Sequence, residues 1–336
     1  MTENKRLLII TVVWNHREAL VRLMDSLRNQ DTQDFQLLVI DNASTDGVAT
    51  FLQEEHPDVT VFRNFKNQGW ARAMNQGIRL ALDHWPEDVR EDRFVTCIEP
   101  TLSLAPDTLS LLTKALASAP ELAMVGPKIL KAGWNVREEG EDAEMVPTSI
   151  LESTGMEMTK ARRYYDRGNK EEDKGQYDEK PDVFGLSGMC CVFRAAALKK
   201  VELDGEWLDS DLPAGQEMWD LMWRARVRGL QPRFVSKAVA WCVPSPLIAS
   251  ARRERRRATY ERCRPVWKND DVSTRIAHAP WILMGNLKSA CVALLHPSLL
   301  ASFLVSWKDW LRMRRKRKKL ITEPRISAKD LRRLFL

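Results

Sequence analysis

The chain has 336 residues, of which 44% are hydrophobic and 29% are charged. These values are ordinary for globular proteins, so they exclude a chain that is disordered throughout and allow one large α/β domain or two smaller domains. The net charge is +6, but residues 251–336 carry 22 Lys and Arg against 7 Asp and Glu, whereas residues 1–250 carry 30 against 39.

The first 130 residues alternate between strand and helix patterns. Apolar runs predict five strands, at residues 7–14, 35–40, 59–63, 94–98 and 122–130. Apolar side chains at helical spacing predict four helices between them, at residues 17–29, 46–55, 70–84 and 106–116. This alternation is typical of a mainly parallel sheet with right-handed crossovers. The first run is short and β-branched, so we expect a strand there and not a signal peptide.

The alternation breaks after residue 130. Residues 134–182 are polar and acidic, and residues 162–180 predict a surface loop that could close over a bound ligand. Three further elements are expected: a strand at 183–194, an amphipathic helix at 216–229 and a last strand at 232–243.

The six cysteines show neither a CxxC pair nor the spacing of a disulfide framework. Cys190 and Cys191 are adjacent, so they would point to opposite faces of a strand. We expect reduced thiols in a cytosolic protein.

Residues 251–336 form a basic and partly apolar extension. Residues 279–313 are the most apolar part of the chain, but Lys288, His296 and Pro297 interrupt them, so no uncharged span of about 20 residues exists. Tryptophans and the cationic run RRKRKK flank them, which favours two helices that lie in the plane of a membrane surface. The alternatives are packing on the rest of the protein or on another subunit, and a solvated basic helix.

We therefore expect a cytoplasmic membrane surface as a partner, bound through residues 252–320. A basic tail can also bind nucleic acid. The apolar residues beside the charges argue against that partner, so we expect no nucleic acid.

The stretch DNASTDG at 41–47 follows the predicted strand 35–40. An acid and an amide at that place can bond a nucleobase or a ribose, because both ligands offer donors and acceptors. Helix capping by Ser44, Thr45 or Asp46 explains the same residues without a ligand.

Glu99 follows the predicted strand 94–98 and precedes Pro100 and Thr101. The carboxyl end of a buried strand is where α/β proteins hold ligands and metals. The alternative is a surface glutamate at a strand end.

Several segments, in the same order along the chain, resemble the family-2 glycosyltransferases, which have the GT-A fold. They are LLIITVVWNHREALVRLMDSLRNQ, FQLLVIDNASTDG, NFKNQGWARAMNQGIRLAL, VFGLSGMCCVFRAAAL and DLMWRARVRGLQPRFVSKAVAW. The C-terminal RISAKDLRRLF also resembles rhamnosyltransferase-like bacterial members.

The resemblance implies an α/β GT-A fold: a Rossmann-like, mainly parallel mixed sheet flanked by helices, with a C-terminal basic amphipathic helical extension. It divides the chain into a glycosyltransferase domain at 1–250 and a tail at 251–336. Within the domain, residues 1–130 would bind the nucleotide and residues 131–250 would carry the acceptor and catalytic groups.

The resemblance also implies a nucleotide site. Val13, Trp14 and Asn15 would border the nucleobase, and Asp41 would bond the base or the ribose. Four more residues would line the pocket: Asn67, Gly69, Arg72 and Asn75. Glycine permits close backbone approach, and an arginine can pair with a diphosphate. For Arg72 and Asn75, an ordinary exposed helix face is an equal alternative.

The family's metal motif after the fourth strand is commonly Asn-Pro-Asp, and this chain has Glu-Pro-Thr. The resemblance implies Mg²⁺ or Mn²⁺ bound by Glu99, which would also face the nucleotide, with Thr101 as a poorer ligand at the second position.

The family's catalytic base belongs to a Glu-Asp pair, which is Glu217 and Met218 here. Glu217 or Asp220 would substitute as the base. The two carboxylates share a helix face, so Asp220 could also be structural. Cys242 stands where the family often has His, and we expect a buried strand thiol there.

The implied function is an inverting glycosyltransferase of the hexosyltransferase type. It would move a sugar from a UDP- or dTDP-sugar, with dTDP-rhamnose a candidate, to a lipid-linked or polysaccharide acceptor. It would act in bacterial cell-envelope polysaccharide synthesis, peripherally on the inner face of the plasma membrane. Thr101, Met218 and Cys242 motivate the alternative of a catalytically impaired relative that serves as a nucleotide- or partner-binding module at the membrane.

Overall fold

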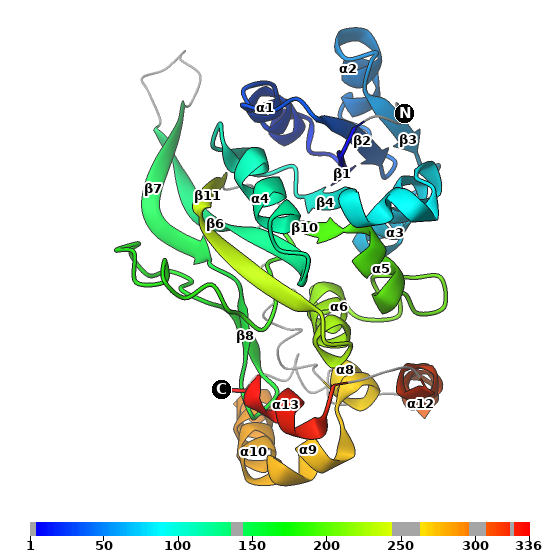
Figure 1. Ribbon diagram of the computed structural model, residues 1–336, viewed down its shortest axis with the longest axis vertical. Coiled ribbons are helices and arrows are strands. Elements are labelled where there is room, and N and C mark those ends of the chain that lie inside the picture. Colours follow the sequence, from blue (N-terminus) through cyan, green and yellow to red (C-terminus); the bar gives the residue numbers. More distant parts are fainter. Residues whose placement is uncertain (1–4, 136–143, 244–262, 296–306, 323–325) are drawn as a thin grey trace.

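A mixed sheet of nine strands forms the centre of the protein (Figure 1). The structure is a computed structural model that describes residues 5–135, 144–243, 263–295, 307–322 and 326–336. The sheet runs in the order β3-β2-β1-β4-β10-β6-β11-β5, with β7 paired to β6. Its strands are β1 (Leu7–Val13), β2 (Phe35–Asp41), β3 (Thr60–Arg63), β4 (Phe94–Ile98), β5 (Leu102–Leu104), β6 (Leu122–Asn135), β7 (Glu144–Ser153), β10 (Cys190–Arg194) and β11 (Gln231–Cys242).

Strand direction confirms the prediction of a mainly parallel mixed sheet. β1 is parallel to β2 and β4, β2 is parallel to β3, and β6 is parallel to β11. β10 is antiparallel to both of its neighbours, β4 and β6. Every residue of β1 is buried, which explains why its sequence is continuously apolar.

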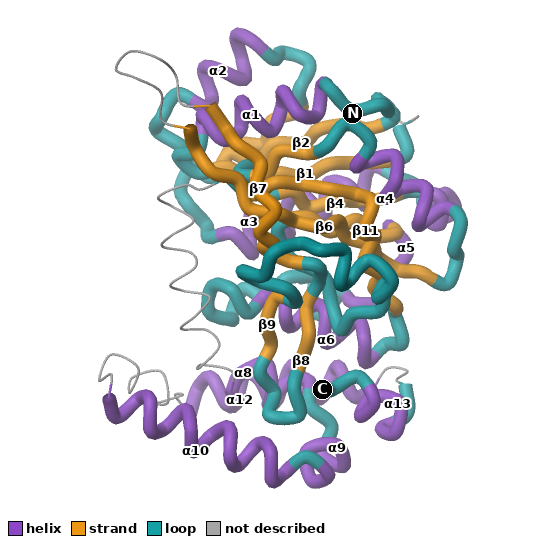
Figure 2. Tube along the Cα trace, turned by 90° about the vertical axis from the view of Figure 1, so that its left-hand side faces the viewer, coloured by secondary structure: helices purple, strands orange, loops and turns teal. Residues whose placement is uncertain are grey.

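Helices cover both faces of the sheet (Figures 1 and 2). Alternate residues of β1 enter two separate cores. Leu7 and Ile9 pack with α1 (Arg17–Arg28), α2 (Val48–Glu55) and α4 (Thr108–Ala117). Leu8 and Ile10 pack with α3 (Trp70–His84), α5 (Ala195–Val201) and α6 (Glu217–Val227). A short 3₁₀ helix, Glu87–Asp92, precedes β4.

The predicted strand at 183–194 is too long, because only Cys190–Arg194 joins the sheet. The preceding residues run against α6 instead. A Cβ on Gly185 would lie 2.7 Å from Met222, and one on Gly188 would lie 3.3 Å from Met218. The glycines therefore allow this segment to approach the helix closely.

The prediction of a surface loop at 162–180 is wrong for the first residues of this range. A hairpin of β8 (Met156–Met158) and β9 (Tyr164–Asp166) lies there. Arg162 is 1% exposed, and Arg167 is 7% exposed. Arg167 donates hydrogen bonds to three backbone carbonyl oxygens, so a polar sequence is buried here with its donors satisfied.

The C-terminal helices lie beneath α6 (Figure 1). They are α8 (Cys263–Asn269), α9 (Val272–Ala277), α10 (Ala279–Leu295), α12 (Trp307–Thr322) and α13 (Ala328–Arg333). Among the residues that the structure describes, we find no helix long and apolar enough to cross a membrane.

A buried ion network joins α8 to α6. The Nζ of Lys268 lies 2.6 Å from Asp209 and 2.8 Å from Asp220, and all three side chains are at most 3% exposed. Asp220 also accepts hydrogen bonds from Asn269 and Arg224. Burial alone would raise the pKa of Asp209, but two neighbouring lysine ammonium groups hold that pKa well below its ordinary value.

The cationic run at 314–319 lies within α12 and also bonds to the protein itself. Lys316 pairs with Asp209, and Lys319 pairs with a second aspartate of the segment before α6. Arg317 donates to backbone carbonyl oxygens at the end of α8. The sequence left open that the C-terminal helices pack on the rest of the protein. These contacts show such packing for α8 and α12.

We expect Lys268→Met to lower the free energy of unfolding by about 3 kcal/mol or more, because two buried carboxylates would lose their shared cation. Urea denaturation at neutral pH measures this change. The control is Arg333→Met, which removes an exposed pair with Asp330 and should cost less than about 1 kcal/mol. Similar losses for both variants would contradict a supporting role for the network.

Candidate active site

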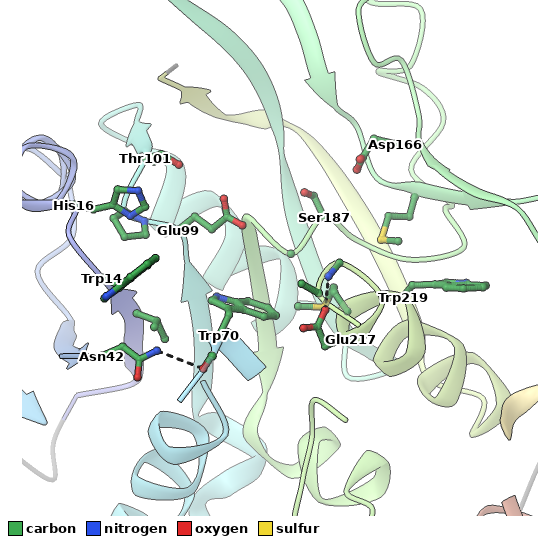
Figure 3. Close-up of a pocket in the computed structure, with 18 of the residues that line it drawn as sticks. Trp14, His16, Asn42, Trp70, Glu99, Thr101, Asp166, Ser187, Glu217 and Trp219 are labelled. Carbon is green, nitrogen blue, oxygen red and sulfur yellow. Dashed lines mark hydrogen bonds between the residues drawn. The ribbon is translucent and has the colours of Figure 1, made fainter. Parts of the chain in front are cut away.

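A cavity of about 440 Å³ lies at the carboxyl ends of β1 and β4 (Figure 3). One wall follows the parallel strands and includes Trp14, His16 and Asn42. The opposite wall comes from the β8–β9 hairpin and the start of α6. The carboxyl edge of a parallel sheet is the usual place for ligands in α/β folds.

The turn after β2 is held by the residues around it. Asp41 is fully buried, accepts the Ser44 N–H at 2.8 Å and lies 3.2 Å from Arg63. The Oδ1 of Asn15 accepts the N–H of Thr45. Val13 is buried too, and Trp14 is the one residue of the predicted Val13–Asn15 group that lines the cavity.

Asp46 bonds the backbone N–H of Arg17 at the start of α1. The helix that follows this stretch, α2, has Gly47 as its N-cap and no side-chain cap, so this bond of Asp46 belongs to α1 and not to the helix for which capping was the alternative.

Asn42 connects the end of β2 to the loop before α3. Its amide donates to Asn67 at 2.8 Å, and its Oδ1 accepts the N–H of Gln68 at 3.0 Å. Asn67 also accepts the N–H of Gly69. Asn67 and Gly69 both line the cavity. The sequence showed that Asn42 follows Asp41. It did not show that the Asn42 amide helps to build this loop, because its partner Asn67 is 25 residues away.

Arg72 and Asn75 are not among the residues that line the cavity. Arg72 is exposed on α3, as its alternative proposed. Asn75 is 5% exposed and bonds the backbone of Trp207 and Leu208. Its side chain therefore fixes the segment that leads into α6.

Glu99 points into the cavity between the two walls (Figure 3). Its backbone N–H donates to Met189 at 2.8 Å, and its carbonyl accepts the N–H of Leu102. Thr101 lines the same cavity and is 4% exposed. Within the described part of the chain, its hydroxyl has no hydrogen-bond partner.

His16 is a cavity residue that the sequence motifs did not indicate. Burial lowers the pKa of its imidazole, and the nearby carboxylates of Glu99 and Asp46 oppose that shift. The nearest signal in the sequence was its place two residues after Trp14.

We compared these residues with the needs of a divalent ion. Among the described residues, no three His, Cys, Asp or Glu side chains form a metal-binding group. Mg²⁺ can nevertheless be held by one or two carboxylates together with substrate phosphates and water. The Glu99 carboxylate and the unpartnered Thr101 hydroxyl fit that mode, in which the protein supplies a minority of the ligands.

The start of α6 supplies a second carboxylate. Glu217 is 6% exposed, lines the cavity and accepts the N–H of Gly215 at 2.6 Å. Met218 lines the cavity beside it. Asp220 is absent from the cavity lining, and its carboxylate lies in the buried network with Lys268.

The β8–β9 hairpin supplies a third carboxylate, which the sequence analysis missed. Asp166 lines the cavity and accepts a hydrogen bond from Ser153 at 2.9 Å. Tyr164 stacks on Trp219 with ring centroids 4.5 Å apart and donates to the Gly215 carbonyl. The polar sequence of this hairpin gave no signal for an ordered wall.

Among the side chains that the structure describes, the cysteines contribute no nucleophile to the cavity. Cys97, Cys190, Cys191 and Cys242 are buried thiols, and none lines the cavity. Burial raises the pKa of Cys97 and of Cys190 to about 12.

Residues 8–202 match the family model for glycosyl transferase family 2. The chain belongs to this family. This family-2 glycosyltransferase is 28% identical over 159 residues to the uncharacterized glycosyltransferase YibD of Escherichia coli, covering 46% of this chain and 42% of the relative. It is 33% identical over 77 residues to an uncharacterized glycosyltransferase of Haemophilus influenzae, covering 23% of this chain and 26% of that relative. The matches thus span less than half of either relative.

Solved structures show the same fold. S. aureus TarS 1–349 in complex with UDP-GlcNAc has a TM-score of 0.50 at 15% identity, covering 92% of this chain and 79% of that chain. GalNAc-T7 with UDP, GalNAc and Mn²⁺ has a TM-score of 0.53 at 12% identity, covering 82% and 54%. At these identities the likeness concerns the fold alone, and it confirms the predicted GT-A fold. The rhamnosyltransferase-like branch stays a prediction.

Gly69 precedes α3 with φ 82° and ψ 159°, a region that is open almost only to glycine. A Cβ there would meet no atom within 4 Å, so the strain is in the backbone. We expect Gly69→Ala to lower the free energy of unfolding by about 1–3 kcal/mol, measured by urea denaturation. Gly133→Ala, whose Cβ would lie 3.9 Å from Val146, is the control. Equal stability of the two variants would show that Gly69 carries no constraint.

Proposed function

We propose that this family-2 glycosyltransferase is an inverting enzyme that takes a UDP- or dTDP-sugar, with dTDP-rhamnose a candidate. The acceptor would be a hydroxyl of a lipid-linked or polysaccharide glycan. One observation supports this best: a single cavity contains Glu99 between a wall built on the parallel strands and a wall that presents Glu217. The solved complexes of TarS with UDP-GlcNAc and of GalNAc-T7 with UDP agree with a nucleotide-sugar donor.

The donor nucleotide lies against the first wall. Trp14 is 44% exposed and offers an indole face on which a base can stack. Gly69 and Asn67 approach the ligand from the loop before α3. Asn15 and Asp41 bond the backbone of the turn after β2. Through this turn they shape the part of the site that borders the base and the ribose.

Glu99 is the residue that would hold Mg²⁺ or Mn²⁺, with Thr101 as a weaker neighbour. When bound, the ion would offset the charge that develops on the departing nucleoside diphosphate. Mn²⁺ is present in the GalNAc-T7 complex.

Glu217 is the proposed base. The Gly215 N–H orients its carboxylate at the start of α6. As the acceptor oxygen bonds to the anomeric carbon and the bond from that carbon to the diphosphate breaks, Glu217 takes the hydroxyl proton. The nucleoside diphosphate leaves with the electron pair. Asp220 serves as a positioning residue, because its carboxylate is bonded to Lys268, Asn269 and Arg224.

The proposed place of action is the cytoplasmic face of a bacterial plasma membrane, in cell-envelope polysaccharide synthesis. The support for a membrane is the set of exposed apolar side chains on α9 and α10. A lipid-linked acceptor would be available at that surface.

A second candidate function is a nucleotide- or partner-binding module without turnover. Met218 and Thr101 favour it, because both line the cavity at positions where the family pattern has acids. Both functions include nucleotide binding, so only a measurement of turnover distinguishes the enzyme from the binding module.

Turnover is measured as release of UDP or dTDP from UDP-glucose, UDP-GlcNAc and dTDP-rhamnose in the presence of Mn²⁺ and of bacterial lipid-linked glycan as the acceptor. We expect at least one donor to be turned over, and Glu217→Gln to reduce the rate by about 10²–10⁴ because the base is lost. Glu54→Gln, which changes an exposed acid on α2, should keep the rate. Full activity of Glu217→Gln would refute the base assignment.

The same assay tests the module. If the natural chain releases nothing from any donor and the double variant Thr101→Asp/Met218→Asp gains release, the protein is a binding module. If the natural chain is active, that function is excluded.

A further inference from the structure

Helices α9 and α10 lie at the edge of the molecule (Figures 1 and 2), and both carry exposed apolar side chains. Leu283, Met284 and Leu287 of α10 are 66–68% exposed. Val272 and Ile276 of α9 and Trp281 of α10 are exposed too. We name these six residues the α9–α10 face. Exposed apolar patches of this kind mark sites of interaction.

Cationic groups lie beside the α9–α10 face. The Nζ of Lys160 is 5.6 Å from the centre of the Trp281 ring. Arg163 donates to the backbone carbonyl of Gly285, on α10, at 3.1 Å. The Arg275 side chain, on α9, is 38% exposed. These charges complement anionic groups next to the apolar surface.

We propose that the α9–α10 face docks on an anionic membrane surface. An apolar helix face with a tryptophan at its border and cations beside it is the combination that binds in the interface of a bilayer. Lysine is attracted to anionic leaflets and is depleted in interfaces between proteins, so Lys160 favours lipid over a protein partner. In the cationic run at 314–319, Lys316, Arg317 and Lys319 bond to the protein itself, and Arg314, Arg315 and Lys318 are exposed.

The docking face is fixed rigidly to the active-site wall. Arg162, at the turn of the β8–β9 hairpin, is 1% exposed and makes two hydrogen bonds to Asp270, of 3.0 and 3.1 Å. It also bonds His278, between α9 and α10, at 2.9 Å. The next residues of the hairpin include Tyr164 and Asp166, which line the cavity.

The hairpin thus joins the membrane face to the acceptor side of the cavity. A membrane-docked molecule would hold that side next to the lipid, where a lipid-linked acceptor enters. The docking deepens the proposed place of action at a membrane, and the second step also rests on the proposed transfer to a lipid-linked acceptor, which is tested separately.

Flotation of the full chain in a density gradient tests the docking. The probes are vesicles of equal parts phosphatidylglycerol and phosphatidylcholine, and vesicles of phosphatidylcholine alone. We expect the protein to float with the anionic vesicles, less with the neutral vesicles, and less at high salt. The double variant Leu283→Glu/Leu287→Glu should bind anionic vesicles at least about tenfold more weakly, because two leucines no longer enter the interface.

Two further variants keep the test independent of folding defects. Ile276→Glu changes the same surface on α9 and should also reduce flotation. Phe65→Glu changes a fully exposed apolar residue of the loop between β3 and α3, outside the α9–α10 face, and should float like the natural protein. Thermal unfolding of each variant confirms that it is folded.

Two results would overturn the docking. In the first, the natural protein stays at the bottom of the gradient with anionic vesicles. In the second, the double variant is folded and floats as well as the natural protein. A double variant that changes oligomeric state in gel filtration while flotation is unaltered would assign the face to a second copy of the chain. UDP binding by the double variant should equal that of the natural protein, so a failure of docking is distinct from a failure of the proposed function.

Discussion

The buried ammonium of Lys268 between Asp209 and Asp220 supports the arrangement around the cavity. Burying charges is favourable only when every partner is in place. Asp220 lies within the first turn of α6, whose first residue, Glu217, lines the cavity, and Asp209 ends the segment that Asn75 fixes. The C-terminal helices therefore belong to the support of the acceptor wall. The helices that carry this network are α8 and α12, and in our proposal two others, α9 and α10, meet the membrane.

The cavity gathers three carboxylates from three different parts of the fold. Glu99 follows β4, Glu217 begins α6, and Asp166 ends β9. In our account Glu99 faces the diphosphate, and Glu217 receives the acceptor proton. Both are held by backbone hydrogen bonds, Glu99 through its own peptide groups and Glu217 through the N–H of Gly215. Such preorganisation matters because reacting groups must be placed before their pKa values count.

Local patterns predicted the N-terminal half of the fold well, because the strands and helices around β1 are specified by periodicity within each segment. Local patterns together with the resemblance to family-2 glycosyltransferases selected residues that lie on the cavity: Trp14, Asn67, Gly69, Glu99, Thr101 and Glu217. They could not place Asn75 or Asp220, whose partners Leu208 and Lys268 are 133 and 48 residues away. The β8–β9 hairpin was missed because its arginines are buried with their donors satisfied, whereas the polar sequence indicated a solvated loop. The orientation of a polar side chain depends on such distant partners, so sequence position alone does not reveal it.

Calorimetric titration of the natural protein with UDP and dTDP, first with Mn²⁺ and then with EDTA, tests the central claim that this cavity binds a nucleoside diphosphate through an ion held at Glu99. Our account predicts binding of at least one nucleotide at a single site with Mn²⁺, weakened about tenfold or more by EDTA, because the ion links the carboxylate to the diphosphate. In Glu99→Gln the difference between Mn²⁺ and EDTA should disappear. Absence of binding to both nucleotides would contradict the nucleotide site, and binding of equal strength in EDTA would contradict the role of Glu99.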